Sequence, residues 1–265
     1  MKVTILGSGT CASQLPNIPN RYPPGFLVEF GDEKILFDCS EGIRFRLEQA
    51  GYNYADIHHV ALTHIHPDHF ALVHFLQSIF GHGLWGGKKN NDITVYCPQE
   101  IRDKYPDLLK AQIHSLDHPS MKTFPKVKFE VMNGNSRQIG GGTLSAEKVY
   151  HEFGLVDAVA FRLETNDGIF VYSGDTGECP GIRKICQNAD IFVCEASARV
   201  GDENSPLNYG HLNPRLAGEI AKQGNVKKMI LFHYTGLDSD ETIVQDCRKS
   251  GFAGEIIVGK DFQTI

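Results

Sequence analysis

The residues with the clearest capacity for chemistry lie in one short segment, Thr63-His64-Ile65-His66-Pro67-Asp68-His69. Side chains two positions apart in an extended chain point the same way, so His64 and His66 face one side. The proline turn that follows brings Asp68 and His69 round to the same space. Imidazole and carboxylate groups are common ligands of divalent metals. The segment therefore predicts a metal site with enough ligands to hold two ions.

Three further candidate ligands, His151, Asp175 and His233, each follow a short apolar run. Such runs are typical of buried strands, and loops at one edge of a sheet converge. A single histidine after a strand is more often a hydrogen-bonded structural residue. The three residues support one another because they occur together with the first cluster, and we expect them to complete the metal site.

The rest of the chain alternates β-rich runs with helical patterns, which is typical of an α/β protein. Strands are expected at 2–6, 25–30, 34–38, 59–63, 93–97, 127–132, 144–149, 158–164, 169–173, 191–195 and 229–232. Helices are expected at 43–50, 70–80, 99–109 and 214–224, and the proline-rich segment 10–24 is expected to be an extended loop. No repeat or low-complexity linker divides the sequence. We therefore expect one domain over residues 1–265, with two sheets face to face and helices outside.

Composition narrows the class of protein. The chain has 265 residues, 26 basic and 32 acidic, and a formal net charge of −6, which disfavours a protein that grips long stretches of nucleic acid. No run approaches the roughly 20 apolar residues of a membrane span, so no membrane association is expected. The seven cysteines are scattered without a Cys-x-x-Cys pair. This pattern predicts a cytoplasmic protein without disulfides.

Taken together, the sequence resembles the metallo-β-lactamase superfamily, and within it the ribonuclease Z-like branch. The likeness covers nearly the whole chain and includes the early segment Asp38-Cys39-Ser40-Glu41-Gly42. The branch is indicated by Glu195-Ala196 after a strand, by Gly210-His211, and by the helical segment 217–221 that leads to the strand before His233. The resemblance implies an α/β fold arranged as a four-layer αββα sandwich.

The resemblance also implies two divalent metal ions with a bridging Asp175. One ion would be held by His64, His66, His151 and Asp175, and the other by Asp68, His69, Asp175 and His233. Zinc is the first expectation, because imidazole with few carboxylates suits it, and manganese or iron could use the same ligands. Asp38 would support the cluster by hydrogen bonding without binding metal.

Phosphodiester hydrolysis is the activity that the resemblance implies. Asp68 would hold the attacking nucleophile, His211 would protonate the departing alkoxide, and Glu195 would orient His211 and favour its charged form. Without the resemblance, Glu195 reads as a capping residue and His211 as a surface loop residue. Tyr209, Asn213 and Tyr234 flank the expected site and are candidate substrate contacts, although tyrosine is equally at home in partly buried packing.

Members of the branch that process transfer RNA carry a protruding Gly/Pro-rich arm, and the sequence contains no such insert, since segment 85–91 is too short. The leading interpretation is therefore a phosphodiesterase that acts on a small substrate, a cyclic nucleotide. The alternatives are a ribonuclease Z-type transfer-RNA 3′ endonuclease, a nucleotide-binding pseudoenzyme, and a thioester or lactone hydrolase. The family is commonly homodimeric, so a homodimer is expected.

Overall fold

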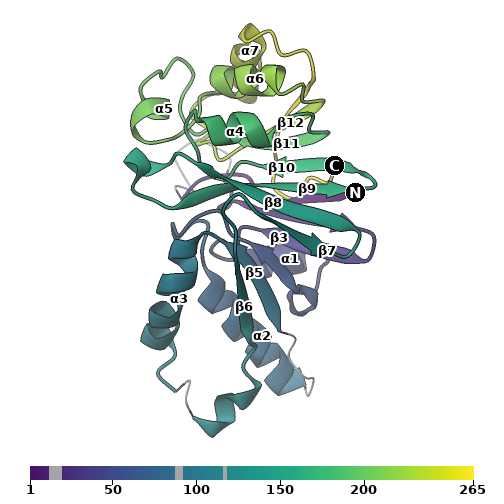
Figure 1. Cartoon of the computed structure of the whole chain (residues 1–265), viewed down its shortest axis with the longest axis vertical. Helices are drawn as coiled ribbons and strands as arrows, with labels where there is room; N and C mark the ends of the chain where they lie inside the picture. The colour runs from purple at the N-terminus through teal and green to yellow at the C-terminus, as the bar shows by residue number, and fades with distance from the viewer. Residues whose placement is uncertain (12–19, 87–91, 116–117) are drawn as a thin grey trace.

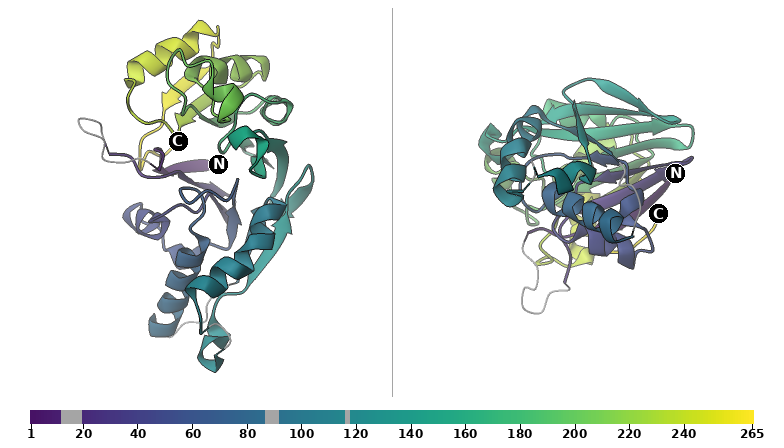
Figure 2. Two further views of the ribbon diagram at one scale, coloured as in Figure 1. Left: turned by 90° about the vertical axis from the view of Figure 1, so that its left-hand side faces the viewer. Right: turned by 90° about the horizontal axis from the view of Figure 1, so that it is seen from below.

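Two β-sheets pack face to face, and helices cover the outer face of each (Figure 1). This computed structural model describes residues 1–11, 20–86, 92–115 and 118–265. In the side view of Figure 2, the blue helices of the first half and the green-to-yellow helices of the second half lie at opposite ends of the molecule. The arrangement confirms the αββα sandwich that the sequence predicted.

The first sheet has the strand order β1-β2-β3-β4-β5-β6. Its strands are β1 (Lys2–Gly7), β2 (Gly25–Phe30), β3 (Glu33–Phe37), β4 (His59–Ala61), β5 (Ile93–Cys97) and β6 (Val127–Val131). Strands β3 to β6 pair in parallel, so their carboxyl ends lie at one edge. The helical segments of this half are α1 (Ile43–Gln49), η1 (Tyr54–Asp56), α2 (Leu72–Gly86), α3 (Gln99–Gln112) and η2 (Pro119–Thr123).

The second sheet has the strand order β13-β12-β11-β10-β9-β8-β7. Its strands are β7 (Ser136–Ile139), β8 (Gly142–Val149), β9 (Ala158–Thr165), β10 (Gly168–Tyr172), β11 (Ile191–Glu195), β12 (Lys228–Phe232) and β13 (Glu255–Val258). Strands β10 to β13 are parallel, and β8 runs in the same direction as β10 because β9 is antiparallel to both. The helical segments are η3 (Glu152–Gly154), α4 (Pro180–Ile185), α5 (Ser205–Asn208), α6 (Pro214–Gln223) and α7 (Asp240–Lys249).

Aromatic side chains fill the space between the sheets. The largest are Phe26, Phe37, Phe161, Phe170, Tyr172 and Phe232, all fully buried. The rings of Phe37 on β3 and Phe170 on β10 have their centroids 5.0 Å apart. Burying one such side chain stabilises the fold by about 1.5–3 kcal/mol. Because both halves of the chain supply these rings, their packing fixes the edge of one sheet relative to the edge of the other.

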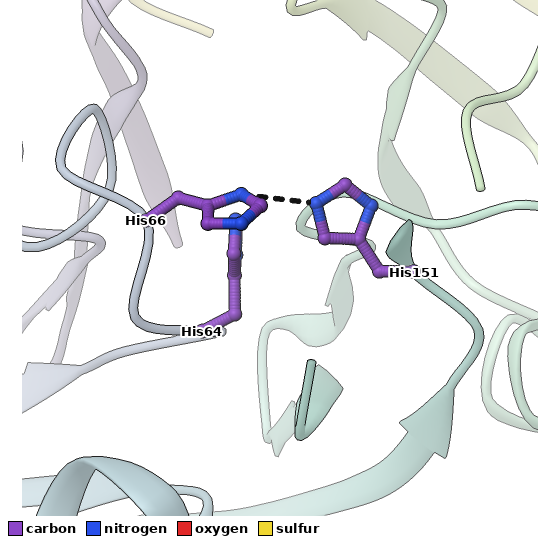
Figure 3. A group of neighbouring side chains, drawn as sticks. All are labelled: His64, His66 and His151. Carbon is purple, nitrogen blue, oxygen red and sulfur yellow. Dashed lines mark hydrogen bonds between the residues drawn. The ribbon is translucent and has the colours of Figure 1, made fainter. Parts of the chain in front are cut away.

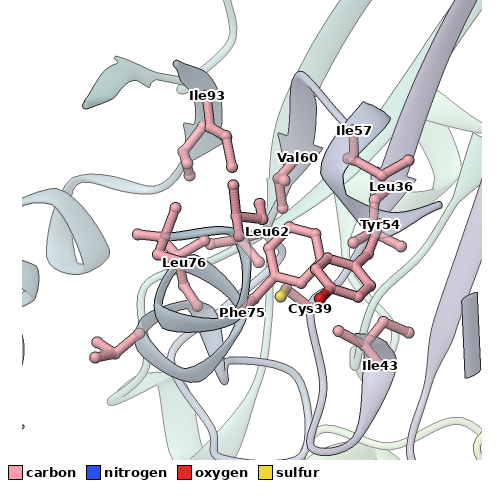
Figure 4. Close-up of a cluster of buried hydrophobic side chains, with 14 of the residues drawn as sticks. Leu36, Cys39, Ile43, Tyr54, Ile57, Val60, Leu62, Phe75, Leu76 and Ile93 are labelled. Atoms are coloured by element: carbon pink, nitrogen blue, oxygen red, sulfur yellow. The ribbon is translucent and has the colours of Figure 1, made fainter. Parts of the chain in front are cut away.

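Helix α2 fixes the segment that carries the first four candidate ligands. It begins at Leu72, three residues after His69, and its buried positions recur at helical spacing. Figure 4 shows Phe75 and Leu76 of this helix packed against residues of the first sheet, including Leu36 and Val60. The helix was expected at 70–80, but it starts two residues later and continues to Gly86.

Several elements carry too weak a pattern to be predicted. They are the polar strand β7, the four-residue strand β13 and the short helices α4 and α5. Helix α7 was also not predicted, although Ser239 caps its first turn and Asp240 and Glu241 lie within that turn, which are local signals of a helix start. Residues 12–19 of the expected proline-rich loop lie outside the described residues. Among those that are described, no helix is both long enough and apolar enough to cross a membrane. All seven cysteines are free, as the sequence predicted.

Candidate metal centre

The expected metal ligands meet at the edge where the parallel strands end. His64, His66, Asp68 and His69 follow β4, and His151, Asp175 and His233 follow β8, β10 and β12 respectively. Figure 3 shows His64 and His66, which follow a strand of the first sheet, facing His151 of the second. Five groups of donor atoms each lie within 4.8 Å among the described residues. Three consist of expected ligands alone: His64, His66 and His151; His64, His69 and Asp175; and Asp68, His69 and His233. The other two include His211, once with His151 and Asp175 and once with Glu195 and His233.

Asp175 lies between the two sets of histidines. Its Oδ2 is 3.9 Å from Nε2 of His64 and 3.9 Å from Nε2 of His151. The same oxygen is 3.4 Å from Nε2 of His233, and Oδ1 is 3.2 Å from Nε2 of His69. One carboxylate thus reaches ring nitrogens of both sets, as a bridging ligand does.

The spacing of the donor atoms fits divalent metal ions. Nδ1 of His66 lies 3.1 Å from Nε2 of His151, and Nε2 of His69 lies 3.4 Å from Nε2 of His233. Two nitrogens bound to one tetrahedral ion at about 2 Å are roughly 3.3 Å apart. In addition, Nε2 of His64 is buried and forms no hydrogen bond with any described residue. A buried nitrogen without a partner is rare and is explained when it is a metal ligand.

The electrostatics of the cluster also suit metal binding. Burial and the neighbouring His69 lower the pKa of His64 well below its usual value, so its ring is neutral. Burial opposes ionisation of Asp175, but His233 and His69 outweigh it and hold the pKa of Asp175 well below its ordinary range. Burial also opposes the charge on His69, yet Asp175 and Asp38 raise the pKa of His69 well above its usual value. A cation bound there takes the place of that proton.

Asp38 holds His69 from the buried side. Its Oδ2 accepts hydrogen bonds from Nδ1 of His69 and from the hydroxyl of Tyr172, both at 2.7 Å, and its Oδ1 accepts one from the backbone N–H of Thr63 at 2.8 Å. Asp38 is fully buried and has a φ of 56°, a conformation that most residues avoid. Because Nδ1 of His69 donates to this carboxylate, Nε2 is the nitrogen that faces the cluster.

Two glycines allow loops to approach the ligands closely. Gly174 has a φ of 57°, and a Cβ there would lie 2.6 Å from Cβ of Thr63. Gly210 has a φ of 74°, and a Cβ there would lie 2.6 Å from Cα of His151, whose Nδ1 donates to the Gly210 carbonyl at 3.1 Å. A side chain at either position would push the adjacent Asp175 or His211 away from the cluster.

His211 lies beside the metal cluster and is paired with Glu195. Nδ1 of His211 donates to Oε1 of Glu195 at 2.9 Å, and the ring centroid lies 5.0 Å from that of His151. Glu195 is fully buried and also accepts backbone hydrogen bonds from Thr176 and Ser197, both at 2.9 Å. Burial opposes the charge on His211, but the Glu195 carboxylate outweighs it and raises the pKa of His211 to about 9. The imidazole therefore carries a proton at neutral pH.

The three candidate substrate contacts have different environments. Tyr209 is 57% exposed, and its ring meets that of Phe153 edge-on at 5.3 Å. Asn213 instead caps α6, because its Oδ1 accepts from the N–H of Leu216 and its Nδ2 donates to the carbonyl of Asp202. Tyr234 is buried, and its hydroxyl donates to Asp240. Asn213 and Tyr234 are thus engaged in capping and packing, and Tyr209 is the most exposed of the three.

Glu152 was not identified from the sequence. Its Oε2 lies 2.9 Å from Nε2 of His66, one of the expected ligands. An acidic residue directly after a histidine is a common pattern without a structural signature of its own. The contact depends on how the turn between β8 and β9 of the second sheet meets the segment after β4 of the first.

Comparisons with known proteins agree with this geometry. A family model for the beta-lactamase superfamily domain matches residues 33–234. Ribonuclease Z of Archaeoglobus fulgidus is 24% identical, with 100% of this chain and 97% of that protein aligned. The metallo-beta-lactamase fold protein YhfI from Bacillus subtilis superposes with a TM-score of 0.79 at 23% identity, covering 100% of this chain and 98% of that one. The short form of human tRNase Z superposes with a TM-score of 0.74 at 22% identity, covering 100% and 98%. The chain therefore belongs to the β-lactamase superfamily, in its ribonuclease Z-like branch, as a metal-dependent hydrolase.

Proposed function

We propose that residues 1–265 form one domain that acts as a dinuclear metal-dependent phosphodiesterase on a small phosphodiester, namely a cyclic nucleotide. The observation that carries this proposal is the position of a charged imidazole, His211, directly beside a cluster of metal-ligating side chains. Hydrolysis of a phosphodiester needs both an activated nucleophile and a proton for the leaving group. This edge of the protein offers residues for both tasks.

Two metal ions are proposed, with Asp175 between them. The first would be held by His64, His66, His151 and Asp175, and the second by Asp68, His69, Asp175 and His233. The donors are mostly imidazoles, which favours zinc, and manganese or iron are accepted by the same set. When bound, such ions lower the pKa of a water molecule and offset charge on the phosphoryl oxygens.

The protein's own residues have separate roles in the proposed reaction. Burial opposes ionisation of Asp68, but the hydrogen bond with His233 and the charges of His69 and His233 together outweigh it and hold the pKa of Asp68 below its usual value. Asp68 is thus a carboxylate that can orient the attacking water and accept its proton. His211 donates a proton to the leaving oxygen from Nε2, because Nδ1 is bonded to Glu195. Glu195 keeps that imidazole charged and correctly oriented.

The absence of an RNA-binding arm favours a small substrate. The described residues include no protruding insert rich in glycine and proline. The alignment with the Archaeoglobus ribonuclease Z spans 320 positions, against 265 residues in this chain, so the relative has inserted residues that this chain lacks. The net charge of −6 also gives little attraction to a long polyanion.

An aromatic rim supports a substrate that carries a base. Tyr209 lies two residues before His211, and Phe153 lies two residues after His151. The two segments also meet through the hydrogen bond from the N–H of Glu152 to the carbonyl of Tyr209. The two rings contact each other, and both are more than half exposed. Stacking on exposed aromatic rings is the usual way in which proteins bind an unpaired base. We therefore assign Tyr209, with Phe153, to contact with the substrate.

The curated ribonuclease Z relatives favour one second function, a transfer-RNA 3′ endonuclease. A third outcome is a protein that binds a nucleotide without hydrolysing it. A panel of cyclic nucleotides, bis(p-nitrophenyl) phosphate and a transfer-RNA precursor, each assayed with zinc, manganese and iron forms, separates the three. Hydrolysis of a cyclic nucleotide is expected. Accurate cutting of the precursor with no turnover of the small substrates would replace our proposal with the endonuclease.

We also propose a homodimer and a cytoplasmic location. The location is supported by seven cysteines that are all free, as in proteins of a reducing compartment. The homodimer is supported by the resemblance to a family whose members are commonly homodimeric. Light scattering on the purified chain is expected to give twice the mass of 29.4 kDa, and a monomeric mass would contradict the dimer.

A further inference from the structure

A partly exposed carboxylate, that of Glu152, contacts one of the proposed metal ligands from outside the cluster. Oε2 of Glu152 lies 2.9 Å from Nε2 of His66, while Nδ1 of the same ring lies 3.1 Å from Nε2 of His151. Figure 3 shows the rings of His66 and His151 next to each other, one from the segment after β4 of the first sheet and the other from the segment after β8 of the second. Since Nδ1 of His66 faces the donor cluster, Nε2 carries the proton when Nδ1 binds metal, and it donates that proton to Glu152.

The orientation of the His66 ring depends on its hydrogen bond to Glu152, whereas the other ligand histidines are also held by burial. The outward nitrogens of three buried histidines have partners within their own surroundings: Thr63 for His64, Asp38 for His69 and the Gly210 carbonyl for His151. The side chain of His66, in contrast, is 30% exposed. Packing alone does not fix its ring, and its partner comes from the other sheet. The hydrogen bond to Glu152 is therefore what sets the direction of Nδ1.

The backbone around Glu152 holds a turn that most residues avoid. Glu152 and Phe153 have φ values of 43° and 56°, and Gly154 follows at 74°. Each non-glycine residue in this region costs on the order of 1 kcal/mol, so the surrounding structure must maintain it. The N–H of Glu152 donates to the carbonyl of Tyr209 at 2.9 Å, and the N–H of Gly154 donates to the carbonyl of His151 at 2.9 Å. The turn keeps the carboxylate of Glu152 beside His66.

We propose that Glu152 is a positioning residue for His66 and strengthens the binding of one of the two ions. Its carboxylate fixes the ring with the proton on Nε2 and aims Nδ1 at the ion proposed to lie between His64, His66 and His151. Its negative charge attracts that ion further. A carboxylate that receives a hydrogen bond from a metal-binding histidine raises both the order and the basicity of that ligand. The inference rests on the proposed metal site.

The test is a zinc titration of the full-length chain, with competition from a chelator, on the wild type and three variants. Glu152→Ala removes the acceptor, and Glu152→Gln keeps an acceptor oxygen but removes the charge. Glu203→Ala is the matched control, because it removes one exposed negative charge from the loop just before α5. We expect Glu152→Ala to weaken the binding of one ion about 10- to 100-fold and to leave the other unchanged. Glu152→Gln should fall between Glu152→Ala and the wild type, and the control should match the wild type.

The outcomes separate this inference from the proposal on which it rests. A wild-type chain that binds no zinc would remove the proposed metal centre itself. A wild type that binds two ions, with Glu152→Ala within twofold of it at both, would overturn only the role of Glu152. Equal weakening in Glu203→Ala would overturn that role too, because it would reduce the effect to general surface charge. A lower melting temperature of metal-free Glu152→Ala, together with loss of both ions, would assign Glu152 to the fold instead.

Discussion

The carboxylate of Glu195 lies 2.9 Å from Nδ1 of His211, which leaves Nε2 as the ring nitrogen available to a substrate. Glu195 is itself held by backbone hydrogen bonds from Thr176 and Ser197. The orientation of His211 is therefore set by a buried partner that is itself held in place. His211 also lies within 4.8 Å of donor atoms of His151 and Asp175, and the bond to Glu195 leaves one ring nitrogen for either a proton or a metal. We assign the proton to His211 and the ions to the other histidines.

This division of roles predicts different results for two histidine substitutions. His211→Ala should lower kcat about 10²- to 10⁴-fold while the protein keeps both ions, because only the proton donor is lost. His66→Ala should lose metal together with activity. Elemental analysis after dialysis, run beside the kinetic assay, measures both effects. Loss of metal in His211→Ala would move that residue into the ligand set.

The charge on His211 predicts the alkaline side of the pH profile. The Glu195 carboxylate raises the pKa of His211 to about 9, so the donor holds its proton at neutral pH and loses it as the pH rises through the pKa. Bound cations lower the pKa, so kcat should fall with a midpoint between about 6.5 and 9. Glu195→Gln removes the carboxylate charge, and the midpoint should move to lower pH. A profile whose alkaline limb is the same in both proteins would show that another group supplies the proton.

Substitutions of Asp38 should lower stability through two causes, the loss of its buried hydrogen bonds and the strain of its positive φ. Asp38→Ala leaves the buried donors of His69 and Tyr172 without an acceptor, which should lower the free energy of unfolding by about 3 kcal/mol. Asp38→Asn should cost less, since asparagine tolerates the φ of 56° and retains one acceptor oxygen. Urea unfolding of the metal-free chains measures both values. Equal stability of Asp38→Ala and the wild type would contradict the buried hydrogen bonds.

The aromatic rim predicts an effect on KM. Tyr209→Ala should raise KM for a cyclic nucleotide about tenfold and leave kcat nearly unchanged, since stacking of one base contributes about 1–3 kcal/mol to binding. Tyr234→Phe is the control, because that hydroxyl is bonded to Asp240 and the ring is buried. Steady-state kinetics of both variants give the comparison. A rise in KM for Tyr234→Phe alone would reverse the assignment of these two tyrosines.

How much could be predicted from the sequence depended on how local each signal is. His64 and His66 could be paired because alternation in an extended segment is a local property. His151, Asp175 and His233 could be placed at the ends of strands, but the distances between them depend on how two sheets pack. Their meeting in the structure follows from the aromatic core rather than from any pattern near the ligands themselves.

Residues outside strong patterns were harder to interpret. Asn213 has the amide of a substrate contact, yet it lies one residue before a helix that begins with Pro214, which is a capping position. Glu152 gave no signal, because its contact with His66 spans 86 positions of sequence. Strand β7 is polar and β13 has four residues, so neither shows the apolar alternation that identifies a half-buried strand.

Each proposed ion draws donors from both halves of the chain, since Asp175 and either His151 or His233 must join the segment after β4. Neither sheet alone offers a complete coordination sphere. Zinc would consequently bind fully only after the two sheets have packed together. At a free zinc concentration a thousand times the dissociation constant, binding would raise the free energy of unfolding by about 4 kcal/mol. Metal uptake in this protein would then report that folding is complete, and chelation would loosen the two layers from one another.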